Sequence, residues 1–404
     1  MRLGRGLASP VSARRLPEPQ REGGFPMNEY TTHVGLDVHA RNVSCRALRP
    51  ETGETWSRTF SGEGHEHELL EWLRRLPGPV RCAYESGCTG FWLSRFLERE
   101  GVACDVVAVS TLPRSPKDRR HKDDRHDAAV VLREICNPAS DVSYVWVPDP
   151  EVEGARDLAR AADAASRMVR SAKQRGCMLL IKHGFVWNER TPSGNLRKTW
   201  TPAWRKWARS CDLGDPLSNM AMRMEIELVE RMERSAKELA KAVAEEAGKP
   251  RWKPYVDALI RLKGVDVQTA FLACAEFGDF SRFRSGRRVS RWIGCTSSED
   301  SSGESRRQGG ITKEGSSYLR HALVEGISSI SRQTAHRKYL RPGHEVSSQV
   351  EDIALEANAR LKRKYDALKD AGKHTNVAKV AVVSELARWM WAIGLQVQRE
   401  QTAA

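Results

Sequence analysis

The stretch T-T-H-V-G-L-D-V-H-A-R-N-V-S-C-R-A-L, residues 31–48, decides the fold of the first part of the chain. Its short runs of strand-forming residues, separated by turn residues, predict strands at Thr31–Val38 and Val43–Leu48, and a similar run predicts a third at Thr55–Phe60. The elements expected next are a helix over 69–76, a strand at Val80–Tyr84, a helix at Phe91–Glu100, a strand at Val102–Val109 and a helix from Asp124 to Ile135. Three strands followed by alternating helix and strand indicate an α/β domain of the RNase-H type.

Acidic residues fall at the ends of these predicted elements. Asp37 lies at the end of the first strand, and Glu85 directly follows the fourth. Asp124 and Asp127 are three residues apart on the last helix, so both can face the same point. Four such carboxylates could hold two Mg²⁺ ions, which bind carboxylates together with water and substrate oxygens. The alternative for each residue is a helix cap or a surface ion pair, and Asp124 suits a helix N-cap.

The composition indicates a polyanionic partner. The 404 residues carry a formal net charge of +14, which favours DNA or RNA binding, although a ribosomal or membrane-surface partner would give the same balance. No apolar run approaches membrane-spanning length, so we expect no membrane partner. Nine cysteines without a C-x-x-C pair argue against a zinc site and a disulfide framework, and favour a reducing cytoplasm.

Pattern and composition together predict four regions. They are a disordered N-terminal extension (1–29), the α/β domain (30–145), a long helical coiled coil (150–250) with a Trp/Arg-rich insertion (184–215), and a mostly α-helical C-terminal domain (251–400). The extension lacks the apolar segment of a secretory signal, and Met27 is an alternative start. The two long helices of the coiled coil, about 151–183 and 216–247, would pair with each other or with another subunit.

Two basic segments are candidate nucleic-acid contacts. A loop before residue 124 suits a nucleic-acid backbone, or is simply solvated, and its candidates are Arg119, Arg120 and Lys122. The insertion mixes cations with tryptophans that would either stack on unpaired bases or pack on the coil, and its candidates are Lys198, Arg205 and Lys206.

The C-terminal region contains a serine pair beside glycine, Ser301-Ser302-Gly303, in a predicted polar loop. Nearby cations that suit phosphate oxygens are Arg306, Arg307, Lys313 and Arg320, and a helix is expected from about Ser316. The loop suits a serine hydroxyl held against a phosphodiester, and the alternative is a solvated loop. Upstream, residues 258–280 predict two helices joined by a K-G-V-D turn. Such a helix-hairpin-helix-like unit can bind a DNA phosphate through backbone N–H groups, and the alternative is ordinary helix packing.

In this order the motifs resemble the insertion sequence 110 family of bacterial transposases, also called DEDD transposases or bridge-RNA-guided recombinases. The motifs are G-L-D-V-H with Asp37, Y-E-S-G with Glu85, K-D-D-R-H-D-A with Asp124 and Asp127, L-K-G-V-D-V-Q-T-A, F-R-S-G-R-R-V-S-R-W-I-G, S-S-G and I-T-K-E-G-S-S-Y-L-R. Two departures stand out: Lys122-Asp123-Asp124 replaces the usual K-T-D, and Lys263-Gly264-Val265-Asp266 replaces the typical P-G-I-G.

The resemblance implies an RNase-H-type (RuvC-like) domain, a coiled coil and a C-terminal transposase domain. It implies a Mg²⁺ site made by Asp37, Glu85, Asp124 and Asp127, and a serine beside glycine that forms a covalent phosphoserine link with DNA. That serine is Ser302, with Ser301 as the near alternative. The implied partners are donor and target DNA, a noncoding bridge RNA and further subunits in a tetramer, whose active sites would combine residues of different subunits. The implied location is the bacterial cytoplasm, in association with the nucleoid.

Two other functions stay open from the residues themselves. One is a metal-dependent nuclease of the resolvase type, in which water attacks and the serine only binds phosphate. The other is a non-catalytic nucleic-acid-binding protein whose acidic positions are structural.

Overall fold

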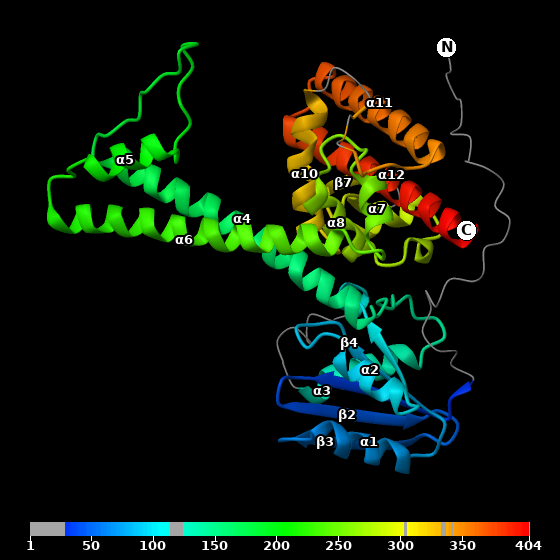
Figure 1. Ribbon diagram of the computed structural model, residues 1–404. Helices are drawn as coiled ribbons and strands as arrows, with labels where there is room; N and C mark the ends of the chain where they lie inside the picture. Colours follow the sequence, from blue (N-terminus) through cyan, green and yellow to red (C-terminus); the bar gives the residue numbers. More distant parts are fainter. Residues whose placement is uncertain are drawn as a thin grey trace. The chain divides into compact units, whose positions relative to one another are not determined.

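The computed structural model describes residues 29–113, 124–302, 305–332, 337–338, 340 and 342–403, with side chains for all of these except 124–126 and 299–308. The chain forms two compact units, one ending at Asp149 and one running from Pro150 to Ala404 (Figure 1). The predicted extension (1–29) lies outside the described residues apart from Glu29. The finer division of the second unit at residues 250 and 251 stays a prediction.

The first unit is built on a five-stranded sheet of order β3-β2-β1-β4-β5. The strands β1 (Thr32–Val38), β2 (Asn42–Arg49) and β3 (Glu54–Ser61) form an antiparallel meander, whereas β4 (Val80–Glu85) and β5 (Ala103–Val107) run parallel to β1. The helices are α1 (His65–Arg75), α2 (Trp92–Arg99) and α3 (Asp124–Ile135), with a 3₁₀ turn, η2 (Val109–Thr111). The predicted α/β class and order of elements are confirmed. The prediction succeeds because the alternation of apolar and polar residues along a strand, and the turn residues between strands, are local features of the sequence.

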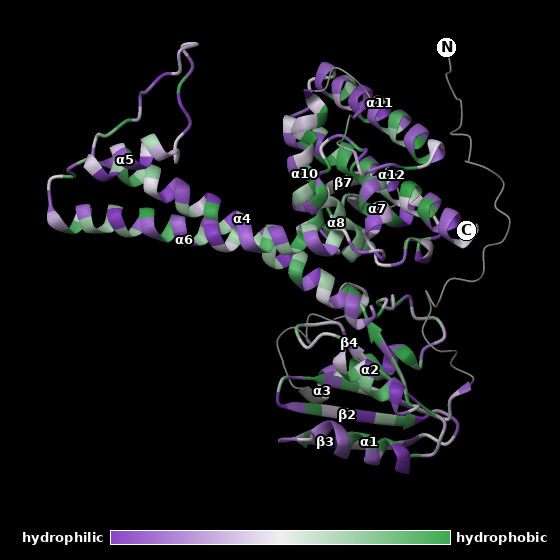
Figure 2. Ribbon diagram, viewed as in Figure 1, coloured by the Kyte–Doolittle hydropathy of each residue, from purple (hydrophilic) through white to green (hydrophobic). Residues whose placement is uncertain are grey.

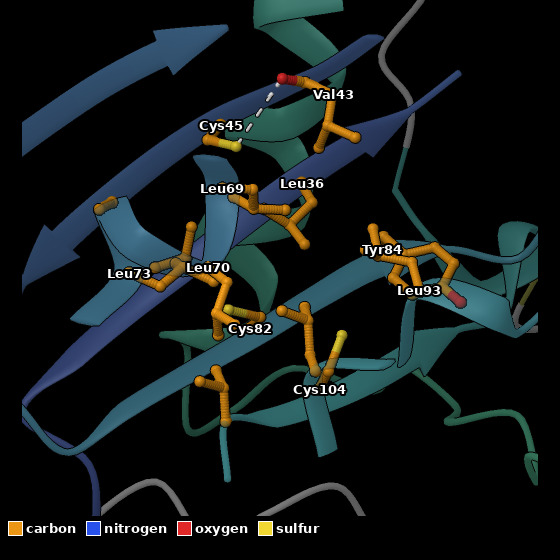
Figure 3. Packing of buried hydrophobic residues seen from close by; sticks show 14 of the residues in the cluster. Leu36, Val43, Cys45, Leu69, Leu70, Leu73, Cys82, Tyr84, Leu93 and Cys104 are labelled. Carbon is orange, nitrogen blue, oxygen red and sulfur yellow. Dashed lines mark hydrogen bonds between the residues drawn. The ribbon is translucent and has the colours of Figure 1, made fainter. Parts of the chain in front are cut away.

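Alternation along the strands gives the sheet two buried faces. On one face, Leu36 of β1 and Tyr84 of β4 pack with leucines of α1 and α2 (Figure 3). On the other face, Ala83 and Val107 pack with Val131 of α3. Burying one large aliphatic side chain contributes about 1.5–3 kcal/mol, so these two layers hold α1 and α2 on one side of the sheet and α3 on the other.

Two long helices, α4 (Pro150–Lys182) and α6 (Pro216–Ala247), lie side by side in the second unit (Figure 1). Ion pairs join Lys173 to Glu233 (2.7 Å) and Arg175 to Glu225 (3.2 Å). Residue numbers therefore increase along α4 as they decrease along α6, so the two helices are antiparallel. Apolar and polar residues recur along both helices in Figure 2, as expected when one face of each is packed.

The insertion between α4 and α6 carries α5 (Pro202–Ser210). Trp204 and Trp200 are only 1% and 7% exposed, and their rings lie 4.3 Å apart. Trp200 fits because α4 has Gly176 beneath it, where an added Cβ would lie 2.8 Å from the Trp200 ring. Since buried rings cannot stack on bases, the structure supports packing on the long helices for these two tryptophans.

The rest of the second unit is mostly helical, as predicted. Its elements are α7 (Lys253–Leu259), α8 (Val267–Phe277), η3 (Phe280–Arg282), α9 (Gly286–Trp292), β6 (Ser297–Ser302), β7 (Ser305–Ile311), α10 (Ser317–Ser331), α11 (Ser348–Asp370) and α12 (Thr375–Ala403). By length and composition α12 could span a membrane, contrary to our expectation that no run is long enough. Its most apolar window is 56% buried within this unit, and it packs on α7, α9, α10 and α11, as the core helix of a water-soluble fold would.

The predicted polar loop around the serines is wrong in one respect. Ser301 and Ser302 end strand β6, which pairs antiparallel with β7 in a two-stranded hairpin. Serine, glutamate and arginine are weak strand formers, so nothing in the local sequence indicates a strand. The hairpin is instead stabilised by its own backbone pairing and by contacts at its base.

Candidate active site

Asp37 and Glu85 lie at the same level of the sheet. The strands β1 and β4 are parallel neighbours in which Leu36 pairs with Tyr84, and Asp37 and Glu85 are the next residues along. Because side chains alternate between faces, both carboxylates belong to the face that carries Gly35 and Ala83, which α3 covers. Asp37 is partly buried, with 15% of its side chain exposed, and lies 3.1 Å from the Nε2 atom of His39.

A glycine in the middle of β1 sets how closely α3 approaches. A Cβ added at Gly35 would lie 2.1 Å from the carbonyl oxygen of Ala128 and 2.6 Å from the amide nitrogen of Leu132. The backbone of α3 therefore lies directly on β1, two residues before Asp37. Gly35 is not among the predicted site residues, although a lone glycine inside a strand pattern is a recognised sign of close backbone approach.

The direction of α3 follows from the packing of its C-terminal end. Cys136, just past that end, packs against the same apolar cluster as Leu48, which pairs with His33 near the start of β1. Tyr144, whose hydroxyl accepts from Arg81 near the start of β4, packs against that cluster too. The helix thus runs antiparallel to β1 and β4, and its first turn points toward Asp37 and Glu85. With about 1.5 Å rise per helical residue, Asp127 and Asp124 lie roughly 4.5 and 9 Å beyond the Gly35 contact. Asp37 lies roughly 6.6 Å beyond it, between the two.

The carboxylate groups at the carboxyl ends of β1 and β4 are of the kind that Mg²⁺ prefers as ligands. Among the described side chains, no group of three or more His, Cys, Asp or Glu residues is close enough to hold a metal ion, and the Asp124 side chain is outside that set. A Mg²⁺ site commonly takes only one or two carboxylates and completes its shell with water and phosphate oxygens. Asp37 and Glu85 meet that requirement, with Asp127 and Asp124 on the helix above.

A buried polar cluster occupies the opposite end of the same face and is structural. The Arg81 guanidinium donates to Asp105 (2.9 Å) and to the hydroxyl of Tyr144 (2.9 Å). His33 is 1% exposed beside them, and burial, with Arg81 nearby, lowers its pKa to about 4. The imidazole is therefore neutral at pH 7. Breaking a buried pair of this kind by removing one partner costs about 3–5 kcal/mol, so the cluster stabilises the amino ends of β1 and β4.

In the second unit, the candidate serine lies at the end of the β6–β7 hairpin. Ser301 pairs with Arg306, and Ser302 pairs with Ser305 across the final rung before the connection at 303–304. The two serines therefore occupy different rungs of the ladder, and Ser302 is the one beside the connection.

The base of this hairpin is clamped by one side chain, that of Arg320. Its Nη1 atom donates to the carbonyls of Ile293 (2.9 Å) and Glu314 (2.8 Å), and its Nη2 atom donates to Lys313 (3.1 Å). Ile293 precedes β6 and the other two residues follow β7, so a single guanidinium ties both ends together. Gly315 tightens the same point, since an added Cβ there would lie 1.9 Å from the Trp292 carbonyl oxygen.

The predicted nucleic-acid contacts divide into three groups. Arg119, Arg120 and Lys122 lie outside the described residues, as do the side chains of Arg306 and Arg307 on β7. The exposed candidates are Lys198, Lys206 and Lys313. The remaining two are engaged within the protein: Arg320 as described, and Arg205 in an ion pair with Glu233 (2.6 Å).

The helix-hairpin-helix-like unit is present as α7 and α8, but its turn is engaged internally. The amide of Lys263 donates to Asn358 (2.8 Å), and the Asp266 carboxylate caps α8 by accepting from the Thr269 amide (2.8 Å). Gly264 packs backbone to backbone on Gly326 of α10, where an added Cβ would lie 2.3 Å from a carbonyl oxygen. A capping carboxylate also repels phosphate, so in this chain the turn favours packing over DNA binding.

Comparison with known proteins identifies the family of the chain. Residues 34–183 match the sequence model of a transposase family named for a DEDD motif and the element IS110, and residues 256–341 match that of the "Transposase IS116/IS110/IS902 family". "Putative transposase y4qE" of Sinorhizobium fredii is 32% identical over 385 residues, covering 93% of this chain and 92% of that protein. "Transposase for insertion sequence element IS1533" of Leptospira borgpetersenii is 25% identical over 260 residues, or 64% of this chain and 72% of that protein. "Probable family 20 transposase" of Pseudomonas aeruginosa is 24% identical over 331 residues, which cover 81% of this chain and 87% of that protein.

Proposed function

This chain belongs to the IS116/IS110/IS902 family of transposases, enzymes that cut and rejoin DNA, and we propose that it does so through a covalent phosphoserine intermediate at Ser302. We propose that Mg²⁺ is held by Asp37, Glu85, Asp124 and Asp127 in an RNase-H-type (RuvC-like) domain. The observation that carries the proposal is the shared level of Asp37 and Glu85 at the carboxyl ends of β1 and β4, with the first turn of α3 directed toward them.

The proposed chemistry divides between the two units. The Ser302 hydroxyl oxygen would form a bond to the phosphorus of a DNA phosphodiester, and the bond from phosphorus to one sugar oxygen would break. The hydroxyl proton would go, directly or through water, to the departing sugar oxygen. Because one phosphate ester replaces another, the reverse attack by a sugar hydroxyl rejoins DNA without an external energy source. Bound Mg²⁺ would supply charge stabilisation at the phosphate oxygens.

The hairpin geometry supports a positioned serine. Ser302 lies at the end of a strand whose base is fixed by Arg320 and by close backbone contact at Gly315. Serine is a weak nucleophile unless it is activated and well oriented. Holding reactants in attacking geometry is worth several kcal/mol, so a hairpin whose base is clamped is suited to present this hydroxyl.

We also propose that the protein works as an oligomer, a tetramer made of two dimers, with donor and target DNA and a noncoding guide RNA. Support for self-association comes from α4 and α6, the proposed coiled coil. Their outer surface exposes Met178 (55%) and Met224 (47%), which line a groove of about 810 Å³. Contiguous exposed apolar side chains commonly mark a protein–protein interface. The net charge of +14 supports a nucleic-acid partner without distinguishing DNA from RNA.

An adduct trap tests the proposal. End-labelled DNA, the RNA encoded beside the element and Mg²⁺ would be incubated with wild-type protein, with Ser302→Ala and with the matched control Ser301→Ala, and then separated under denaturing conditions. We expect a protein–DNA adduct with wild type and Ser301→Ala and none with Ser302→Ala, because in our proposal Ser302 alone attacks the phosphate. Equal cutting by all three proteins without an adduct would instead identify a nuclease that uses water. Magnesium-independent binding without cutting would identify a binding protein.

A further inference from the structure

The short helix α9 exposes a row of arginines beside the serine hairpin. Arg287, Arg288 and Arg291 lie on its outer face and are exposed. The inner face carries Val289 and Ser290, both buried. These positions follow helical spacing, so the division into a basic outer face and a packed inner face is a property of the helix.

The inner contacts of α9 hold it firmly against α12. The Ser290 hydroxyl donates to the carbonyl of Ser384 (3.2 Å) and accepts from Nε of Arg388 (2.6 Å). At its C-terminus, Trp292 packs against Phe277 and Phe283, with ring centroids 5.0 and 5.1 Å apart. The outer arginines are thus displayed on a helix with a fixed position in the second unit.

The charge of this segment has one sign. Between Asp279 and Glu299 the sequence contains no acidic residue, and its arginines are Arg282, Arg284, Arg287, Arg288 and Arg291. An ordinary solvated helix face mixes both signs, whereas a one-sign surface attracts a polyanion. From Arg287 to Arg291 the helix rises about 6 Å, the axial length over which one DNA strand carries about two phosphates.

We propose that the outer face of α9, made by Arg287, Arg288 and Arg291, binds the phosphate backbone of the DNA on which the serine hairpin acts. This inference rests on the proposed role of Ser302. The helix ends at Trp292, and the next residue, Ile293, offers the carbonyl that Arg320 holds. The helix and the hairpin base therefore form one piece, so a strand bound along α9 would have a defined position relative to Ser302. That connection favours DNA over the guide RNA as the ligand.

The test measures binding by the full-length protein to a labelled DNA duplex of arbitrary sequence, and to an RNA duplex of equal length, without Mg²⁺. The variant combines Arg287→Gln, Arg288→Gln and Arg291→Gln, and a charge-matched control combines Arg234→Gln, Lys237→Gln and Lys241→Gln on α6. Each phosphate contact contributes about 0.9 to the slope of log K against log salt concentration. We expect the α9 variant to lower the slope for DNA by roughly 2–3, and the control to leave it unchanged.

Three results would overturn the inference: an unchanged slope for the α9 variant, an equal fall in the control, or a fall confined to RNA. The first would mean that α9 does not touch the backbone, and the second that only net charge matters. Since this assay needs neither Mg²⁺ nor the serine, it is independent of the adduct trap. A lowered DNA slope together with absent adducts would sustain α9 as a DNA contact and reject Ser302 as the nucleophile.

Discussion

One added methyl group at Gly35 should displace the acidic residues of the first unit. The Cβ of Gly35→Ala would lie 2.1 Å from the Ala128 carbonyl oxygen, whereas ordinary contacts with a Cβ begin near 3.4 Å. Restoring that distance requires a shift of about 1.3 Å, the difference between the two values. Both neighbours at this contact are backbone, so no side chain can rotate away, and α3 must move as a body.

The expected consequence is larger for activity than for stability. Overpacking a buried contact typically costs about 1–3 kcal/mol, which leaves most domains folded. The same movement carries Asp127 and Asp124 away from Asp37 and Glu85. A misplacement of about 1 Å in catalytic geometry can lower a rate by about 100-fold. We therefore expect Gly35→Ala to form the phosphoserine adduct about 100-fold more slowly than wild type while remaining folded.

The assay combines urea unfolding with the rate of adduct formation measured well below the unfolding midpoint. Gly154→Ala on α4 is a suitable control, because an added Cβ there meets no atom within 4 Å. Alanine is the better helix former, so this control should unfold with a free energy up to about 1 kcal/mol higher and react at the wild-type rate. Wild-type stability and adduct rate in Gly35→Ala would refute the close approach of α3 and the placement of the acidic residues that depends on it.

Two further predictions concern the clamp and the buried histidine. Arg320→Lys should slow adduct formation and leave DNA affinity unchanged, because one ammonium group cannot reach carbonyls at both ends of the hairpin; a parallel loss of affinity would show that Arg320 contacts DNA instead. The free energy of unfolding should be constant above about pH 6.5 and fall as pH decreases toward 4, because the folded-state pKa of His33 is lowered to about 4 and the unfolded chain takes up the proton first. Urea titrations at several pH values measure this, and His33→Gln should weaken the dependence; an unchanged dependence in that variant would remove His33 as its cause.

The sequence predicted the first unit well because its signals are local. Alternation within β1 and β2, and turn residues between them, depend on neighbours only, and the strand bounds differ from prediction by one or two residues. The bounds of α6, Pro216–Ala247, agree fully, since Asp215 caps its start and Gly248 follows its end. The sequence also placed Asp37 and Glu85 at strand ends, whereas their shared level in the sheet follows from the parallel pairing of β1 and β4.

What the sequence did not reveal depends on contacts between distant residues. The β6–β7 hairpin is made by pairing, and Arg320 stabilises it from a later helix, so weak strand propensity around Ser302 predicted a loop. The burial of Trp200 depends on Gly176 in α4, which is 24 positions away by residue number. Sequence composition could not choose between stacking and packing there, because both use the same residue types.

The two proposed catalytic parts share one construction principle, in which a glycine admits backbone where a side chain would intrude. Gly35 lets α3 rest on β1 in the first unit, and Gly315 lets the end of β7 meet the end of α9 in the second. Neither residue carries a reactive group. Each nevertheless fixes the distance between elements that carry the proposed catalytic or DNA-binding residues. Precise placement by backbone contact is less adjustable than placement by side chains, because a helix or hairpin must shift as a whole. Substitutions at these glycines should therefore impair DNA cutting more than folding, and they would do so in separate units through the same physical cause.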